Sequence, residues 1–268
     1  MVVDGVSVHY EVQGSGPAVF LLHGWGSNLT LFDPVAEILA TQYRVVRLDF
    51  PGCGTSSEPS QPWGMDEYVH FTASFISAIC QAESSESDES GGTSAQPIIV
   101  LGHSHGGRVA IRLATDPGLP FTVTKMILVD SAGILPQRSL SYHVRVRSYK
   151  LGKAVLQWKP VATLFPDALA RLQSTMGSTD YAAASPVMRG SLVKVVNADL
   201  QPLLPRVRAE TLVVWGELDA ETPVSDGRIM EREIPGSGLV VLPGAGHYSF
   251  LDQAYTFGKV LESFLQIG

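Results

Sequence analysis

Six short apolar runs that alternate with helical patterns constrain the fold of this 268-residue chain more than any other feature of its sequence. The runs are rich in Val, Ile and Leu and comprise Ala18 to Leu22, Arg44 to Leu48, Pro97 to Leu101, Lys125 to Val129, Thr211 to Trp215 and Leu239 to Leu242. Such runs are typical of parallel strands that are buried on both faces of a sheet. Helical periodicity falls between them, at Leu31 to Ala40, Met65 to Cys80 and Arg108 to Ala114. We therefore predict an α/β fold in which a mostly parallel central sheet carries helices on both faces.

The N-terminal segment predicts one more strand, at the edge of the sheet. Apolar residues Val6, Val8, Tyr10 and Val12 alternate there with Ser7, His9 and Glu11, which is the period-2 pattern of a strand with one solvent-exposed face. We expect this strand to pair antiparallel. In the parallel part of the sheet, right-handed crossovers carry the loops that leave the strands to one rim, where ligands of open α/β folds bind. Functional residues are therefore expected on those loops.

Two segments interrupt the alternation of strands and helices. Residues 84–95 are acidic and rich in serine, so they bury too little apolar surface to become ordered, and we predict a flexible surface loop. Residues 134–197 contain no strand-like run but carry helical patterns, which predicts a helical cap inserted into a core of residues 1–133 and 198–268. We expect the cap to supply most of a substrate pocket, and the candidates are Tyr142, Trp158, Phe165 and Met188.

The composition disfavours several classes of protein. The formal net charge of −7 disfavours a nucleic-acid partner, which needs clustered Lys and Arg. The basic residues between 138 and 153 are interpreted as a solvated helix face. The sequence has neither a signal-peptide pattern nor an apolar stretch near the roughly 20 residues of a membrane span. Cys53 and Cys80 are too few for a disulfide framework or a cysteine-based zinc site, which favours a reducing cytoplasm.

The candidate nucleophile is Ser104, in the sequence GHSHG between a strand-like run and a helical pattern. This matches the G-x-S-x-G turn of serine hydrolases, which requires a strand before it and a helix after it. The glycines allow a sharp turn that leaves the serine hydroxyl exposed above the sheet. The alternative interpretation is an ordinary glycine-rich turn.

A serine hydroxyl needs a base to take its proton, and His247 is the best-placed histidine of the seven. It follows the last apolar run and so lies on a loop at the predicted rim. The other histidines are placed less well: His9 on the edge strand, His70 and His143 in helical patterns, His23 in an early turn, and His103 and His105 beside the serine, where packing or substrate contact suits them better.

The base needs a carboxylate that fixes its tautomer, and two aspartates compete for this role. Asp219 follows the run that ends at Trp215, whereas Asp130 directly follows the run that ends at Val129. We favour Asp219, because the chain order Ser, Asp, His is typical of this architecture. The alternative role for Asp130 is to cap the segment that follows it.

The developing oxyanion needs fixed backbone donors. The N–H group of His105 is one candidate, because this residue follows the nucleophile, and Trp25 in the glycine-rich turn LLHGWGSN is the other. That turn is also compatible with a purely structural role.

Taken together, the motifs resemble those of the α/β-hydrolase superfamily. They are HGW at 23–25, DFPGCGTS at 49–56, GHSHGG at 102–107, GELD at 216–219 and GAGH at 244–247. The resemblance implies a catalytic triad of Ser104, Asp219 and His247 with oxyanion donors at Trp25 and His105. The chain departs from the family pattern in its acidic loop and in the histidine at 105.

The resemblance implies hydrolysis of a small carboxylic ester through an acyl-enzyme, without a metal or organic cofactor. The same machinery serves aminopeptidases and carbon-carbon bond hydrolases, so the fold does not name the substrate. A small-ligand receptor with little turnover and a degenerate scaffold are the non-enzymatic alternatives, and the oligomeric state stays open.

Overall fold

The computed structural model describes residues 1–84, 95–135 and 184–268, together with isolated positions between 136 and 183. Apart from its two end residues, the predicted acidic loop at 84–95 lies outside the described residues, and so does most of the predicted cap at 134–197. The pocket candidates Tyr142 and Phe165, as well as His143, also lie outside them. The expectations for these segments stay predictions.

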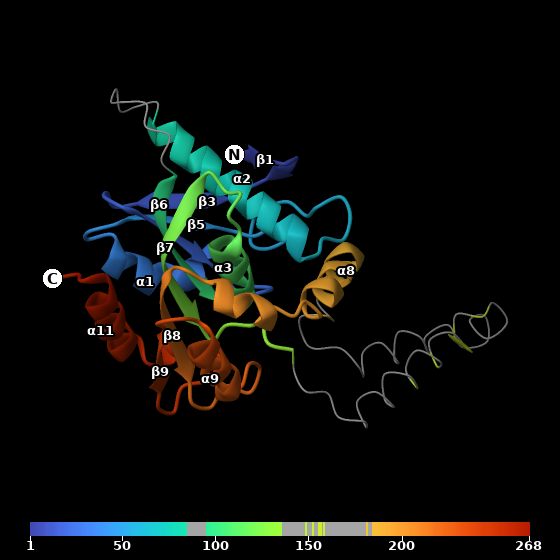
Figure 1. Cartoon of the computed structure of the whole chain (residues 1–268). Helices are drawn as coiled ribbons and strands as arrows, with labels where there is room; N and C mark the ends of the chain where they lie inside the picture. The colour runs from blue at the N-terminus through green and yellow to red at the C-terminus, as the bar shows by residue number, and fades with distance from the viewer. Residues whose placement is uncertain are drawn as a thin grey trace.

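A seven-stranded sheet forms the centre of the molecule, in the order β3-β5-β4-β6-β7-β8-β9 (Figure 1). The strands are β3 (Tyr10–Gln13), β4 (Ala18–Leu22), β5 (Arg44–Leu48), β6 (Gln96–His103), β7 (Phe121–Val129), β8 (Glu210–Gly216) and β9 (Gly238–Leu242). All neighbours pair in parallel except β3, which pairs antiparallel with β5. The mostly parallel sheet predicted from the apolar runs is confirmed.

The N-terminal segment differs from the single strand that was predicted over Val6 to Val12. Its first part is a separate hairpin of β1 (Val2–Val3) and β2 (Val6–Ser7), and only β3 joins the main sheet. The hairpin turns at Asp4 and Gly5, which both have positive φ. An Asp-Gly pair favours this kind of tight turn.

The interruption after β2 also has a hydrogen-bonding cause. The backbone N–H groups of Ser7 and His9 donate to the hydroxyls of Ser57 and Ser56, each at 2.9 Å. These donors therefore bond to the loop after β5 and are not available to a neighbouring strand, which explains why the period-2 pattern failed as a guide to strand length.

Helices cover both faces of the sheet (Figure 1). One face packs against α2 (Met65–Ser84) and α3 (His105–Thr115), and the opposite face packs against α1 (Asp33–Leu39) and α11 (Ala254–Leu265). The remaining elements are η1 (Leu29–Phe32), α8 (Pro186–Val195), η2 (Gln201–Arg206), α9 (Val224–Glu233) and α10 (Ser249–Asp252).

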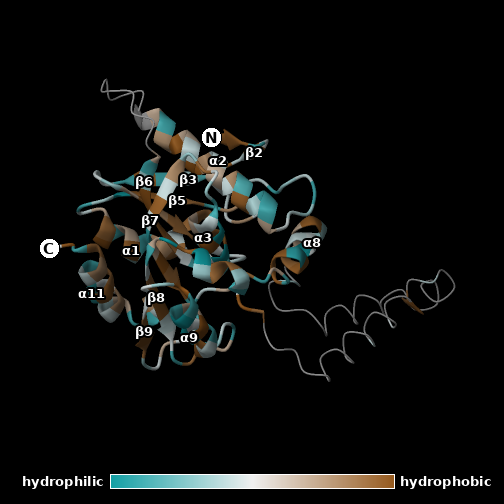
Figure 2. Ribbon diagram, viewed as in Figure 1, coloured by the Kyte–Doolittle hydropathy of each residue, from teal (hydrophilic) through white to brown (hydrophobic). Residues whose placement is uncertain are grey.

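The strands alternate their side chains between two apolar clusters, one on each face of the sheet. In β4, for example, Phe20 and Leu22 join the cluster under α2 and α3, whereas Val19 and Leu21 join the cluster under α1 and α11. The hydropathy colouring shows brown strands at the centre, with helices of mixed teal, white and brown around them (Figure 2). Burial on both faces holds the sheet rigid, so the loops at its rim start from fixed points.

Candidate active site

Ser104 occupies a strained turn between β6 and α3. Its backbone has φ 50 and ψ −111, a conformation that residues with a side chain seldom adopt. The turn is compact because glycines flank it: a Cβ placed on Gly106 would lie 1.9 Å from the Leu22 carbonyl oxygen, and one on Gly102 would lie 2.5 Å from the Gly106 carbonyl oxygen. The helix therefore begins directly against β4 and β6, and the Ser104 side chain is left half-buried at the apex.

His247 and Asp219, which were predicted to interact, are in direct contact. The imidazole Nδ1 of His247 lies 2.8 Å from Oδ2 of Asp219. His247 follows β9 and Asp219 follows β8, and these strands are neighbours in the sheet. Because Asp219 accepts at Nδ1, the histidine carries a proton there and presents Nε2 on its other side.

The Asp219 carboxylate is held in place by the chain that follows it. Its Oδ1 accepts hydrogen bonds from the backbone N–H groups of Glu221 at 2.8 Å and Thr222 at 3.0 Å. Its Oδ2 also accepts from the Thr222 hydroxyl at 2.8 Å. Sequence reasoning missed Thr222, although aspartate side chains often accept a hydrogen bond from the backbone a short distance further along the chain.

Burial and hydrogen bonding shift the pKa values of Asp219 and His247 in opposite directions. Burial by itself would raise the pKa of Asp219, but the hydrogen bonds from His247 and Thr222 outweigh it and place that pKa below its ordinary value. Burial would likewise lower the pKa of His247, whereas the hydrogen bond and charge of Asp219 outweigh it and raise that pKa. The pair therefore favours an ionised carboxylate next to a basic imidazole.

The His247 loop is docked onto the turn that carries Ser104. The ring of His103, which precedes Ser104, lies 4.9 Å from the His247 ring, and its Nε2 donates to the His247 carbonyl oxygen at 2.8 Å. In the part of the chain that the structure describes, the Ser104 hydroxyl makes no hydrogen bond to His247. Hydrogen bonds of this kind are often long until a substrate binds.

The Asp130 carboxylate forms its hydrogen bonds with groups other than His247. This buried carboxylate accepts from the Gly216 N–H at 2.7 Å and from the backbone N–H and hydroxyl of Ser249 at 3.0 and 2.6 Å. It thus ties the end of β7 to the end of β8 and to the start of α10, and the alternative role as a cap of its own following segment is wrong. Burial, the largest effect, raises the pKa of Asp130 to about 7.

The two residues predicted as oxyanion donors lie side by side. The rings of Trp25 and His105 are 5.4 Å apart in an edge-to-face arrangement. A Cβ on Gly24 would lie 3.2 Å from the Ser104 Cβ, so the turn with Trp25 approaches the nucleophile closely. Within the described ranges, the backbone N–H groups of Trp25 and His105 donate to no other group, as is usual for the first N–H of a helix.

Three other histidines near the turn are buried and neutral. His23 bonds to the Gly24 carbonyl oxygen through Nδ1 at 2.7 Å and accepts from the Phe50 N–H at Nε2, and burial lowers its pKa to about 4. Burial lowers the pKa values of His103 and His105 to about 3. The burial of His103 and His105 agrees with a packing role, and the alternative of substrate contact stays a prediction.

A cavity of about 240 Å³ lies beside the turn with Trp25. The predicted pocket residue Met188, on α8, lines it together with Trp25, and Gly52, Cys53, Glu58 and Ser185 are also in its wall. Trp158, another pocket candidate, is 66% exposed and is not among the residues that line this cavity.

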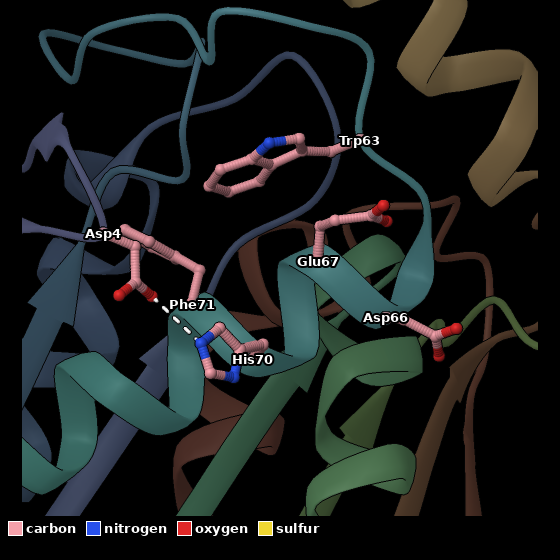
Figure 3. A pocket seen from close by; sticks show the side chains of 6 residues that line it. All are labelled: Asp4, Trp63, Asp66, Glu67, His70 and Phe71. Atoms are coloured by element: carbon pink, nitrogen blue, oxygen red, sulfur yellow. Dashed lines mark ion pairs between the residues drawn. The ribbon is translucent and has the colours of Figure 1, made fainter.

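A second cavity of about 300 Å³ lies beside the N-terminal part of α2 (Figure 3). Trp63 and Phe71 form its apolar wall, and His70 is 3.7 Å from Asp4 at one side. None of the predicted catalytic residues lines it.

Two further features of the described residues concern membranes and metals. None of the helices in the described ranges combines the length and apolar character of a bilayer span. No three His, Cys, Asp or Glu side chains in those ranges gather as metal ligands would. The prediction that no cofactor is needed stays a prediction.

The chain belongs to the α/β-hydrolase family, whose model matches residues 19–257. It is 28% identical over 262 residues to a pimeloyl-[acyl-carrier protein] methyl ester esterase of Neisseria meningitidis, covering 92% of this chain and 93% of the relative. It is 30% identical over 277 residues to a dihydrolipoyllysine-residue acetyltransferase component of an acetoin cleaving system from Cupriavidus necator, covering 98% and 67%. The crystal structure of an enol-lactonase from Burkholderia xenovorans LB400 superposes with a TM-score of 0.70 at 23% identity, covering 98% of both chains, which shows a shared fold.

Proposed function

We propose that the protein is a serine hydrolase that cleaves a small carboxylic ester through an acyl-enzyme intermediate. The observation that carries this proposal is the pair of His247 and Asp219, joined at 2.8 Å on the rim that also bears the strained Ser104 turn. A histidine oriented by a buried carboxylate, on the same rim as a half-buried serine, is the arrangement that activates a hydroxyl for attack on a carbonyl carbon.

The residues take the following roles in this proposal. Ser104 Oγ attacks the ester carbonyl carbon while His247 Nε2 accepts its proton, and Asp219 stabilises the imidazolium that forms. The backbone N–H groups of Trp25 and His105 donate to the oxyanion. The alcohol leaves with the proton from His247. The same nitrogen then takes a proton from a water molecule that attacks the acyl carbon, and it returns this proton to Ser104 Oγ as the acid is released.

The comparisons support an ester as the substrate class. Methyl ester esterases occur among the relatives, and an enol-lactonase is among the structural neighbours. The cavity beside Trp25 supports a small acyl or alcohol group, because its volume is about 240 Å³ and Met188 provides an apolar wall. A carbon-carbon bond hydrolase is the second candidate, since a meta-cleavage product hydrolase shares the fold.

Substitution of Ser104 tests the proposal. We expect the wild-type protein to hydrolyse p-nitrophenyl acetate and to be labelled by a fluorophosphonate, and Ser104→Ala to lose on the order of 10⁶-fold in kcat and all labelling. Ser225→Ala is the matched control, because Ser225 is exposed on α9 and lies outside the proposed site. A loss below tenfold in Ser104→Ala would remove Ser104 as the nucleophile.

A further inference from the structure

A second carboxylate approaches His247 on the side opposite Asp219. Oε2 of Glu221 lies 3.4 Å from Nε2 of His247, while Asp219 holds Nδ1. The Glu221 side chain is 68% exposed, whereas the His247 side chain is only 8% exposed. An almost fully buried ring therefore has an ionisable partner at each nitrogen, and one of these partners reaches it from solvent.

We propose that Glu221 is a positioning residue for the reaction, whose carboxylate lies against Nε2 of His247 and favours the doubly protonated ring before substrate binds. The effect of Glu221 on the reaction rests on the proposed function, whereas its effect on the protonation of the His247 ring does not. Asp219 accepts a hydrogen bond at Nδ1, and Glu221 approaches Nε2 as an ion-pair partner at 3.4 Å. A negative charge near each nitrogen favours the positively charged, doubly protonated ring over the neutral one.

The buried histidines nearby show the opposite arrangement. Nδ1 of His23 meets a carbonyl oxygen and Nε2 accepts from an N–H group, so this ring is satisfied in its neutral form. Nε2 of His103 donates to a carbonyl oxygen, and no carboxylate contacts Nδ1. Among these rings, His247 is the one with carboxylates on both sides.

The other groups that face His247 do not oppose a charged ring. Asp130, which directly follows β7, raises the pKa of His247 when its carboxylate is ionised, as Asp219 and Glu221 do. The ring of His103 at 4.9 Å is neutral because burial lowers its pKa to about 3, and the Tyr248 ring lies 5.6 Å away. The nearby hydroxyl of Thr222, 3.3 Å from Nδ1, is uncharged.

The consequence concerns the pH at which the proposed base works. A proton on Nε2 must leave before Ser104 can transfer its own proton to this nitrogen. A carboxylate that stabilises the protonated ring therefore moves the acid limb of the kcat/KM profile to higher pH. Because Glu221 is exposed, its effect is screened by salt, and substrate can displace it without disturbing the core.

Glu221→Gln tests the proposal, with Glu37→Gln as a control of equal charge change, since Glu37 is exposed on α1. We expect the pKa of His247, followed by NMR of the full chain labelled in its histidines, to fall by roughly 0.2–0.7 in Glu221→Gln and to stay in place in Glu37→Gln. Salt at about 0.5 M should lower the wild-type value towards that of Glu221→Gln and leave the variant almost unchanged.

The acid limb of kcat/KM for p-nitrophenyl acetate should shift by the same amount, with the high-pH plateau preserved within about twofold. An unchanged or raised pKa of His247 in Glu221→Gln, or an equal fall in Glu37→Gln, overturns the role of Glu221. The titration needs no turnover, so an active Ser104→Ala protein would refute the proposed function while leaving the Glu221 result intact.

Discussion

Replacing Asp219 by asparagine is expected to abolish the base function of His247 while the fold persists. The oxygen of the new amide can keep the hydrogen bonds that Oδ1 accepts from the N–H groups of Glu221 and Thr222. Its NH₂ group then takes the place of Oδ2, 2.8 Å from Nδ1 of His247. A donor at this place forces Nδ1 to accept, so the proton moves to Nε2 and this nitrogen can no longer take the proton of Ser104.

The wrong tautomer should lower kcat by on the order of 10⁴-fold, which corresponds to about 5 kcal/mol in the activation free energy. Stability should change much less. Because the pKa of Asp219 lies below its ordinary value, its charge stabilises the fold at pH values above the unfolded-state pKa, and this contribution is lost as the pH falls through the folded-state pKa. The asparagine variant loses the contribution at all pH values, so its Tm at pH 8 should fall modestly.

The assay is initial-rate hydrolysis of p-nitrophenyl acetate at pH 8, combined with imidazole nitrogen shifts that report the tautomer. Asp130→Asn is the matched control, because Asp130 is a buried rim aspartate whose carboxylate forms its hydrogen bonds with Gly216 and Ser249. We expect it to retain far more activity than Asp219→Asn. If Asp130→Asn loses more kcat, or if Asp219→Asn keeps over a tenth of it, the assignment of the acid is refuted.

Two substitutions in the first turn of α3 test the packing there. Gly106→Ala should lower Tm by at least about 5 °C, because the new Cβ would lie 1.9 Å from the Leu22 carbonyl oxygen. Gly238→Ala is the control and should leave Tm nearly unchanged, because no atom lies within 4 Å of its Cβ. Equal Tm values for the two variants would contradict the close packing at Gly106. His105→Leu should raise Tm by about 2–4 °C, because both buried ring nitrogens lack a hydrogen-bond partner among the described residues. A lower Tm would show that these nitrogens stabilise the fold.

Much of the fold could be predicted from the sequence, because a run of apolar residues indicates a strand that is buried on both faces. The runs that begin at Ala18 and Arg44 match β4 and β5 residue for residue. Other elements extend beyond their apolar cores: β6 reaches His103 and α3 starts at His105, because polar residues continue the backbone hydrogen bonding. The Asp4-Gly5 turn was readable as a hairpin signal, but the longer alternating pattern obscured it.

The part of the candidate site that could be predicted is the part whose residues follow directly from the ends of strands. Parallel strands with right-handed crossovers bring the loops after β8 and β9 together, which is why the contact of Asp219 with His247 could be anticipated. The directions of the side chains could not be predicted in the same way. The approach of Glu221 to Nε2 and the bonds of Asp130 to Ser249 depend on rotamers and on packing between distant segments, and neither leaves a periodic trace in the sequence.

The placement of the three proposed catalytic groups has a consequence for how this enzyme could diversify. Ser104, Asp219 and His247 all start from the ends of strands in the central sheet, and residues 134–197 contribute none of them. Residues 134–197 are predicted to supply most of the substrate pocket, so exchanging that segment should change which substrates bind and leave Ser104, Asp219 and His247 in place. Under this prediction, substrate choice and reaction chemistry depend largely on different segments of one chain.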